Sequence, residues 1–328
     1  MPKETLFEVS LRPRVVVASA VVAVGLGMWA LNAIAPVTPA ASRPNLVRAD
    51  SNRHGATTLA VGRDATVAAP VEAVESLALA ERYDAEGYDW DAVIAGDSDV
   101  PRVAVKTLPK DLVHLQDVDL KKSLFFRTLL PMALQVNDEI EADRDRLLDL
   151  KAKRDAGDAL SRGETAWLNK IASKYNAQAN DFETLLRRVD GVPPSLVLAQ
   201  AAEESGWGTS RFVREGNALF GQWTWSDNHR GIVPSERGEG ETHKIRAFPS
   251  VKGAISAYVH NLNTHPAYER FRIQRAMGAS GYQLTATLDR YSERREKYVD
   301  TLRSIMSANR LASLDRAKLS EEIHLVSR

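Results

Sequence analysis

The sequence predicts a mainly α (α+β) protein, in which a small β-lobe interrupts the helices and a transmembrane helix and disordered linker precede the folded part. Three observations support this class. An apolar run lies near the N-terminus, and a stretch poor in aromatic residues follows it. Beyond that stretch, helix-capping patterns and helical periodicity dominate until one region rich in glycine and aromatic residues breaks them.

The N-terminal apolar run covers residues 15–31, which are 17 uncharged and almost wholly apolar residues. About 20 apolar residues in a helix cross the ~30 Å core of a bilayer, whereas the apolar part of a signal peptide usually has about 7–15. The length therefore predicts an uncleaved transmembrane anchor at residues 15–35, with a cleaved signal segment as the alternative. Arg12 and Arg14 directly precede the run, which predicts that residues 1–14 are a cytoplasmic tail.

Residues 36–107 are rich in Ala, Thr, Ser, Pro and Val and show no sustained helical period. A segment of this composition buries too little apolar surface to offset the entropy lost on folding. We therefore expect a disordered linker, and a flexible chain of about 70 residues has a root-mean-square reach of about 45 Å.

Residues 108–190 are predicted to form a helical N-terminal part of the folded region. Apolar residues recur there at steps of three and four: Phe126, Leu130, Ala133, Val136 and Ile140. Pro131 is expected to kink this helix or to mark its early turns. Two capping boxes, Ser161 with Glu164 and Asn180 with Glu183, predict two further helices.

Residues 191–310 are predicted to form the functional domain. Its first helix reads "SLVLAQAAEES", with Ser195 as the predicted N-cap, and it ends at Gly206. The following region is rich in glycine, aromatic residues and turns, and "HKIRAF" has strand character, which together predict a small β-lobe. Helical patterns then return, and residues 311–328 are expected to be a surface helix or a frayed tail.

Composition excludes several functions. Lys and Arg number 43 and Asp and Glu number 43, so the chain lacks the basic surplus typical of nucleic-acid binders. The absence of cysteine excludes disulfides and thiolate chemistry. His243, His260 and His265 do not have the spacing of a metal-binding motif, and no phosphate-binding loop is present, so neither a metal nor a cofactor is expected.

Two adjacent glutamates, Glu203 and Glu204, end the apolar helix. A carboxylate at a helix C-terminus faces the negative end of the helix dipole, and partial burial raises its pKa further. A carboxyl with a raised pKa suits general acid catalysis near neutral pH. Spacing alone does not choose between the two glutamates, and an exposed charge pair would produce the same pattern.

Aromatic residues follow the glutamates closely: Phe220, Trp223 and Trp225. Aromatic faces can stack on the apolar faces of sugars, although core packing would select the same residues. Together, "LVLAQAAEESGWGTSRF", "NALFGQW" and "YSERREKYVDTL" resemble the bacterial glucosaminidase domain of glycoside hydrolase family 73, and most closely its Bax-type members in Gram-negative bacteria.

The resemblance implies a lysozyme-like fold and hydrolysis of the β-1,4 bond between N-acetylglucosamine and N-acetylmuramic acid in peptidoglycan. The family's general acid is the glutamate directly before "SGWG", which corresponds to Glu204. With the apolar run, it implies a single-pass inner-membrane protein with its catalytic domain in the periplasm, or a periplasmic protein if the run is cleaved.

The resemblance also implies a second carboxylate in the β-lobe, and Glu236 is preferred among the acidic residues of "PSERGEGE". It suggests substrate contacts by Asn217, Phe220, Trp223 and Tyr291. Many relatives have Asn directly before "LFG", where this chain has Ala218, which weakens the role of Asn217.

Two alternative functions stay open at this level. A muramidase or lytic transglycosylase would use the same acid on a different bond or with a different product. An inactive glycan-binding scaffold would retain the fold without cleavage.

Overall fold

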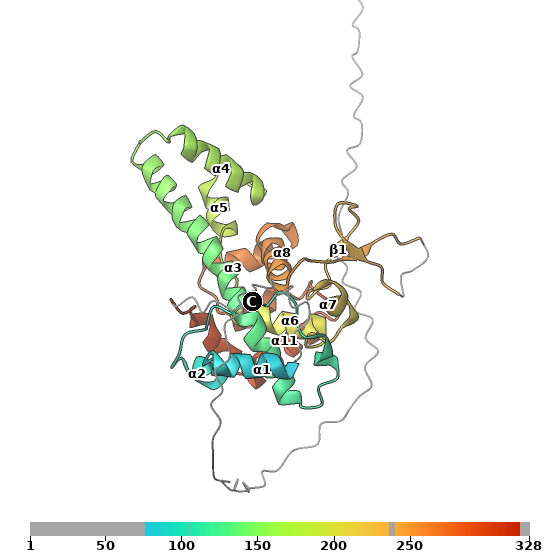
Figure 1. The fold of residues 1–328 in the computed structure, drawn as a ribbon. Helices are drawn as coiled ribbons and strands as arrows, with labels where there is room; N and C mark the ends of the chain where they lie inside the picture. Colours follow the sequence, from blue (N-terminus) through green and yellow to red (C-terminus); the bar gives the residue numbers. More distant parts are fainter. Residues whose placement is uncertain (1–75, 104, 236–239, 322–328) are drawn as a thin grey trace, which may run out of the picture. The chain divides into compact units, whose positions relative to one another are not determined.

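The computed structural model describes residues 76–103, 105–235 and 240–321. The predicted tail at 1–14, the predicted anchor at 15–35 and most of the predicted linker lie outside these residues. Within the described residues, no helix has both the length and the apolar character to cross a bilayer. The described part is mainly helical with one small sheet, which confirms the predicted mainly α class (Figure 1).

Folded structure begins earlier than the sequence predicted. Residues 76–107, assigned to the linker, contain α1 (Ser76–Ala85) and α2 (Trp90–Ala95). Leu79 and Tyr83 of α1 are buried, as is Tyr88 in the turn before α2. The linker prediction is wrong for this segment because its few large apolar residues fall at helical spacing and pack on the main helical body. The Asp89 side chain caps α2 by accepting from two backbone amides of its first turn.

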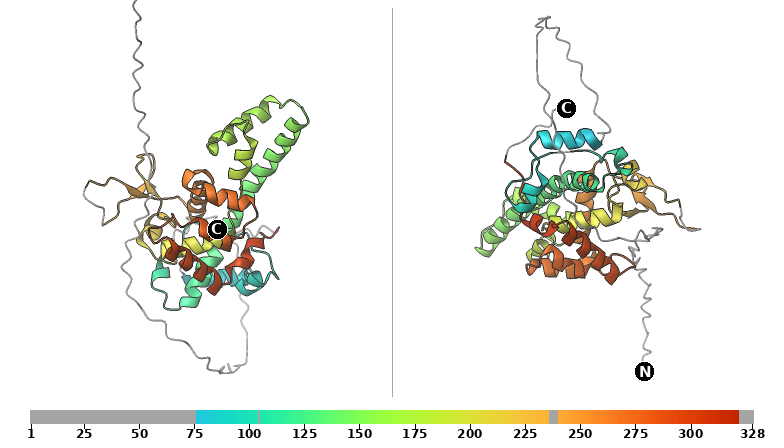
Figure 2. Two further views of the ribbon diagram at one scale, coloured as in Figure 1. Left: turned by 180° about the vertical axis from the view of Figure 1, so that it is seen from behind. Right: turned by 90° about the horizontal axis from the view of Figure 1, so that it is seen from below.

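The longest helix, α3 (Val118–Asp155), starts slightly before the predicted pattern. Pro131 lies well inside it, with a buried side chain, and does not mark an early turn. Beyond α3, the Ser161–Glu164 capping box is confirmed at the start of α4 (Arg162–Lys174). Figures 1 and 2 show α4 beside the C-terminal half of α3. The two segments form a helical hairpin that projects from the other helices.

The next helix, α5 (Phe182–Arg188), is capped one residue later than predicted. Asp181, and not Asn180, is its N-cap, and its side chain accepts from the Thr184 amide at 2.9 Å. An N-cap side chain accepts from the amide three residues later, and here the amide that needs an acceptor is that of Thr184, so the cap is Asp181.

The central helix is α6 (Pro194–Ser205), and nearly all of its residues are buried. It begins after Pro193 with Pro194 in its first turn, so the prediction of Ser195 as N-cap is wrong. The Ser195 amide instead donates to Asp315 Oδ1 at 3.0 Å. Figures 1 and 2 show α11 (Glu296–Ala308) alongside α6.

Asp315 belongs to η4 (Leu311–Arg316), in which Leu311 and Leu314 are fully buried. The expectation of a surface helix or a frayed tail at 311–328 is therefore wrong up to residue 319, because the apolar residues of η4 are buried. Leu319 pairs with Val100, which follows α2, in an isolated parallel bridge.

A three-stranded antiparallel sheet forms the predicted β-lobe. Its strand order is β1-β3-β2, with Trp223 opposite Ile245 and Gly231 opposite Arg246. The strands are short: β1 (Trp223–Thr224), β2 (Gly231–Ile232) and β3 (Lys244–Arg246). The remaining elements are η1 (Lys110–Val113), α7 (Arg211–Gly216), α8 (Val251–Thr264), η2 (Pro266–Tyr268), α9 (Glu269–Ala276), α10 (Gly281–Leu284) and η3 (Thr285–Thr287).

Candidate active site

The turn that follows α6 fixes the position of its terminal glutamates. Gly206 takes a left-handed conformation with φ of 57° and ends the helix. The Ser205 hydroxyl donates to the Ala201 carbonyl and accepts from the Gly208 amide at 2.8 Å. This buried serine therefore closes the turn onto the last turn of the helix.

The turn packs closely on the N-terminal half of the domain. The Trp207 ring makes edge-on contacts with Phe125 and Phe126, at centroid distances of 5.8 Å and 5.3 Å. A Cβ on Gly208 would lie 2.7 Å from Leu108 Cδ1, so only glycine fits there without a shift. The end of the helix at Gly206 confirms the prediction, and the contacts place Trp207 beneath the turn.

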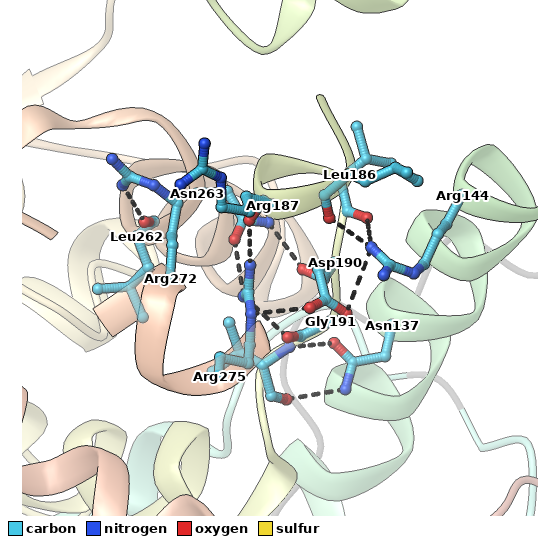
Figure 3. A network of polar contacts seen from close by, with 12 residues as sticks. Asn137, Arg144, Leu186, Arg187, Asp190, Gly191, Leu262, Asn263, Arg272 and Arg275 are labelled. Carbon is cyan, nitrogen blue, oxygen red and sulfur yellow. Dashed lines mark hydrogen bonds and ion pairs between the residues drawn. The ribbon is translucent and has the colours of Figure 1, made fainter. Parts of the chain in front are cut away.

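The loop before α6 is held by an extensive polar network (Figure 3). Asn137 of α3 forms a pair of hydrogen bonds with the backbone of Val192, at 2.8 Å and 3.0 Å. The buried Arg275 guanidinium donates to the Gly191 carbonyl at 2.9 Å and contacts the Asp190 carboxylate at 3.1 Å. Since both ends of α6 are held, the helix presents its last side chains in fixed positions.

Glu204 is half-buried at the end of α6 and accepts a hydrogen bond from the Tyr298 hydroxyl of α11 at 2.7 Å. That hydroxyl also accepts from Gln200 Nε2 at 2.8 Å, and Tyr258 of α8 donates to Gln200 Oε1. Because Gln200 uses its amide donor on Tyr298, the tyrosine directs its own proton to Glu204 Oε1. The dissociable proton of Glu204 then belongs on Oε2.

Burial raises the pKa of Glu204 to about 7. The hydrogen bond from Tyr298 and the charge of Arg294 lower this pKa, whereas the neighbouring Glu203 raises it, and burial dominates. Near neutral pH the carboxyl is therefore divided between its acid and base forms, as a general acid requires. This agrees with the expectation from the sequence for the end of α6.

Tyrosines surround the carboxyl. Tyr291 stacks on Tyr298 with a centroid distance of 5.6 Å, and Tyr268 of η2 lies 6.1 Å from Tyr291. The charge of Glu204 raises the pKa of Tyr291 and of Tyr268, after burial as the main cause. The structure thus places Tyr291, a predicted site residue, beside the candidate acid.

Glu203 has a different role from its neighbour. Its Oε1 atom forms an ion pair with Arg294 at 2.7 Å, and Arg294 also donates to Thr301 at 3.1 Å. The Arg294 guanidinium lies over the Tyr298 ring, 5.9 Å from its centroid. Through Arg294, Glu203 therefore holds the segment before α11 at the end of α6. Tyr298 lies in the first turn of α11.

The other predicted contact residues lie in or near the β-lobe. Asn217 is buried as the left-handed C-cap of α7, and its amide donates to the Phe248 carbonyl at 3.1 Å. Phe220 is buried and stacks on Tyr258 at 3.9 Å. Neither side chain presents an open surface to a ligand in this conformation, because both complete the packing between the lobe and α8.

Trp223 is half-buried and stacks on His243 at 4.0 Å, and Trp225 beside it is 58% exposed. Glu236, the predicted second carboxylate, lies outside the described residues. Glu241 is exposed, and its Oε2 atom is 3.7 Å from His243 Nδ1. Among the described residues, no cluster of His, Asp or Glu has a geometry that could hold a metal ion.

The sequence did not identify Gln200, Tyr258 or Tyr298 as site residues. Gln200 stands one helical turn before Glu204, and this spacing places the two side chains on one face of α6. The tyrosines come from α8 and α11, so only the folded chain brings them to the acid.

Comparison with known proteins identifies the family. The glucosaminidase family model, described as mannosyl-glycoprotein endo-beta-N-acetylglucosaminidase, matches residues 179–311. The chain is 36% identical over 201 residues to Protein bax of Escherichia coli (strain K12), which covers 58% of this chain and 70% of that protein.

Two shorter matches are to proteins named peptidoglycan hydrolase FlgJ. Peptidoglycan hydrolase FlgJ of Escherichia coli (strain K12) is 35% identical over 105 residues, covering 29% of this chain and 34% of FlgJ. The protein of the same name from Salmonella typhimurium is 37% identical over 89 residues, covering 24% and 28%. No solved structure matches the chain significantly. The extent of the match to Protein bax, together with the family model, shows that the chain belongs to the glucosaminidase family as a Bax-type glucosaminidase domain protein.

Proposed function

We propose that this protein is a peptidoglycan hydrolase that cleaves the β-1,4 bond between N-acetylglucosamine and N-acetylmuramic acid, with Glu204 as general acid. The observation that carries the proposal is the Glu204 carboxyl, which has a pKa of about 7 and is held by Tyr298 at the end of α6. Membership of the glucosaminidase family and the similarity to the peptidoglycan hydrolase FlgJ support peptidoglycan as the substrate.

In this mechanism, Glu204 donates its proton from Oε2 to the glycosidic oxygen as the bond to the anomeric carbon breaks. Water then adds to that carbon, and the proton it releases restores the acid. Tyr298 keeps Oε1 occupied throughout, so that the proton transfer uses one defined oxygen. Glu236 is kept as the proposed second carboxylate because it lies between β2 and β3 in the sequence. Trp223 and Tyr291 are kept as proposed substrate contacts.

The products of purified sacculi test the bond assignment. After digestion and borohydride reduction, mass spectrometry should detect N-acetylglucosaminitol at the new ends. Muramic-acid ends would contradict the proposal in favour of a muramidase, and anhydro-muramic ends would indicate a lytic transglycosylase. Binding without any new ends would indicate the inactive scaffold.

We also propose that residues 15–35 anchor the protein in the inner membrane, with the catalytic domain in the periplasm. The support is the uncharged run of 17 residues at 15–31. A C-terminally tagged protein should stay in the membrane fraction after alkaline carbonate extraction and be digested by protease only after the outer membrane is opened. Release of a shorter, soluble form would indicate cleavage at this segment.

A further inference from the structure

A hollow lies where α7, β2 and η1 meet, on the edge of the sheet opposite to the Trp223 strand. It has a volume of about 650 Å³, within the range of about 300–1,000 Å³ typical of ligand sites. It is lined by Lys110, Arg214, Glu215, Arg230, Gly231 and Ile232.

Three of these side chains are cationic and exposed: Lys110, Arg214 and Arg230. None of them makes a side-chain hydrogen bond or ion pair in the part of the chain that the structure describes. The one carboxylate of the hollow, Glu215, contacts Arg211 at 3.1 Å and so is already paired. The hollow therefore carries a local positive excess in a chain whose formal net charge is zero.

Like charges around a concave surface reinforce each other's potential and attract anions. The hollow and the candidate acid are close in the sequence. The helix α7, which lines the hollow, starts at Arg211, and only the turn at 206–210 separates α7 from the end of α6. The two edges of the sheet differ. Trp223 in β1 and Trp225 just after it lie at one edge, and Arg230, directly before β2, lies at the other.

We infer that this basic hollow binds the carboxylates of the peptides that branch from the muramic acid residues of a glycan strand. The inference rests on the proposed function for its choice of substrate. Sugar rings with apolar faces and peptides with free carboxylates occur together on such a strand, and the two edges of the lobe offer a complementary surface to each. The balanced charge of the whole chain gives no reason to prefer a nucleic acid.

Binding to sacculi tests the inference without requiring catalysis. The full chain with Glu204→Gln serves as the parent, and a triple variant adds Lys110→Glu, Arg214→Glu and Arg230→Glu. Sacculi are used either intact or with their carboxylates converted to methylamides. We expect the triple variant to bind intact sacculi about tenfold more weakly than the parent, with a smaller difference at high salt.

The parent should bind methylamidated sacculi with about the low affinity that the triple variant shows for intact sacculi. On methylamidated sacculi the two proteins should have equal affinity. The matched control changes three exposed cations that also lack side-chain partners among the described residues, Arg162, Lys170 and Lys318, to glutamate. This control alters net charge equally and should bind like the parent. Circular dichroism establishes that all variants are folded.

Three outcomes would overturn the inference. They are parent-like binding of intact sacculi by the triple variant, equal weakening of binding by the control variant, and an equal loss of binding by the triple variant on methylamidated sacculi. A wild-type protein that cleaves no sacculi yet shows the amidation-sensitive loss would refute the proposed hydrolase while supporting the site.

Discussion

The end of α6 and the β-lobe are built in opposite ways. At the end of α6, long helices hold a carboxyl among buried tyrosines, and successive hydrogen bonds link Glu204 to Tyr298, Gln200 and Tyr258. In the lobe, strands of two or three residues are flanked by Trp225, which is 58% exposed, and by Arg230, whose exposed side chain makes no hydrogen bond or ion pair within the described residues. The difference suggests a division of labour, because proton transfer needs fixed and desolvated groups, whereas docking a polymer needs accessible surface.

The largest effect is expected from Glu204→Gln. Loss of the acid should lower kcat/KM on sacculi by about 10³-fold, since general acid catalysis contributes about 10²–10⁴-fold. Turbidity clearance and product release measure the effect. The control is Glu203→Gln, which leaves the acid in place and should retain most activity. Equal losses in the two variants would contradict the assignment of the acid to Glu204.

A second large effect should come from Gly208→Ala. The residue has φ of 78° and its new Cβ would lie 2.7 Å from Leu108, so left-handed strain and overpacking together should lower the free energy of unfolding by about 3 kcal/mol. Gly87→Ala is the matched control, with φ of 69° and open space around the new Cβ, and should cost only about 1 kcal/mol. Denaturant unfolding measures both, and equal costs would show that the turn tolerates a side chain.

The raised pKa of Glu204 predicts a pH-dependent stability difference. The pKa changes from 4.5 in the unfolded chain to about 7 in the fold, so ionisation destabilises the folded state. This destabilisation is absent below pH 4.5, grows as pH rises, and is complete above pH 7. Relative to wild type, Glu204→Gln should therefore gain about 3 kcal/mol between pH 4.5 and pH 8. A pH-independent difference would show that Glu204 titrates normally.

A smaller effect, on the pH profile, is expected from Tyr298→Phe. Its hydroxyl lowers the pKa of Glu204, so removing it should raise that pKa and move the alkaline limb of kcat/KM to higher pH. Gln200 also loses an acceptor, which should cost about 1–3 kcal/mol of stability. Tyr83→Phe removes a buried hydrogen bond to Thr128, and neither residue contributes to the pKa of Glu204, so this variant should reduce stability without moving the alkaline limb. A shift in both variants would indicate a general effect of destabilisation.

The smallest effect concerns the lobe. Trp225→Ala should raise KM for sacculi by about 3–10-fold through a lost aromatic contact and change the unfolding free energy by less than about 0.5 kcal/mol. Steady-state kinetics and thermal unfolding measure the two quantities. A fall in kcat with unchanged KM would instead place Trp225 in the catalytic arrangement and remove the contrast between the two regions.

Much of the fold could be predicted from local sequence. The Ser161–Glu164 capping box, the glycine turn after α6 and strand β3 within "HKIRAF" were evident from residue type and spacing. The N-terminal segment was not, because α1 and α2 are short, with 10 and 6 residues, and gain their stability by packing on α3 and η4. The buried C-terminal residues Leu311 and Leu314 were missed for the same reason.

The sequence by itself determined the helical class, the resemblance to glucosaminidases and the choice of Glu204 as the proposed general acid, since these depend on motifs of contiguous residues. Only the tertiary structure decided what raises the pKa of that carboxyl and what its neighbour contacts. Gln200, Tyr258 and Tyr298 come from three helices, and Glu203 pairs with Arg294, a residue 91 positions away in the numbering of the chain. Burial and hydrogen bonding set a pKa, and both depend on which distant segments the fold brings together.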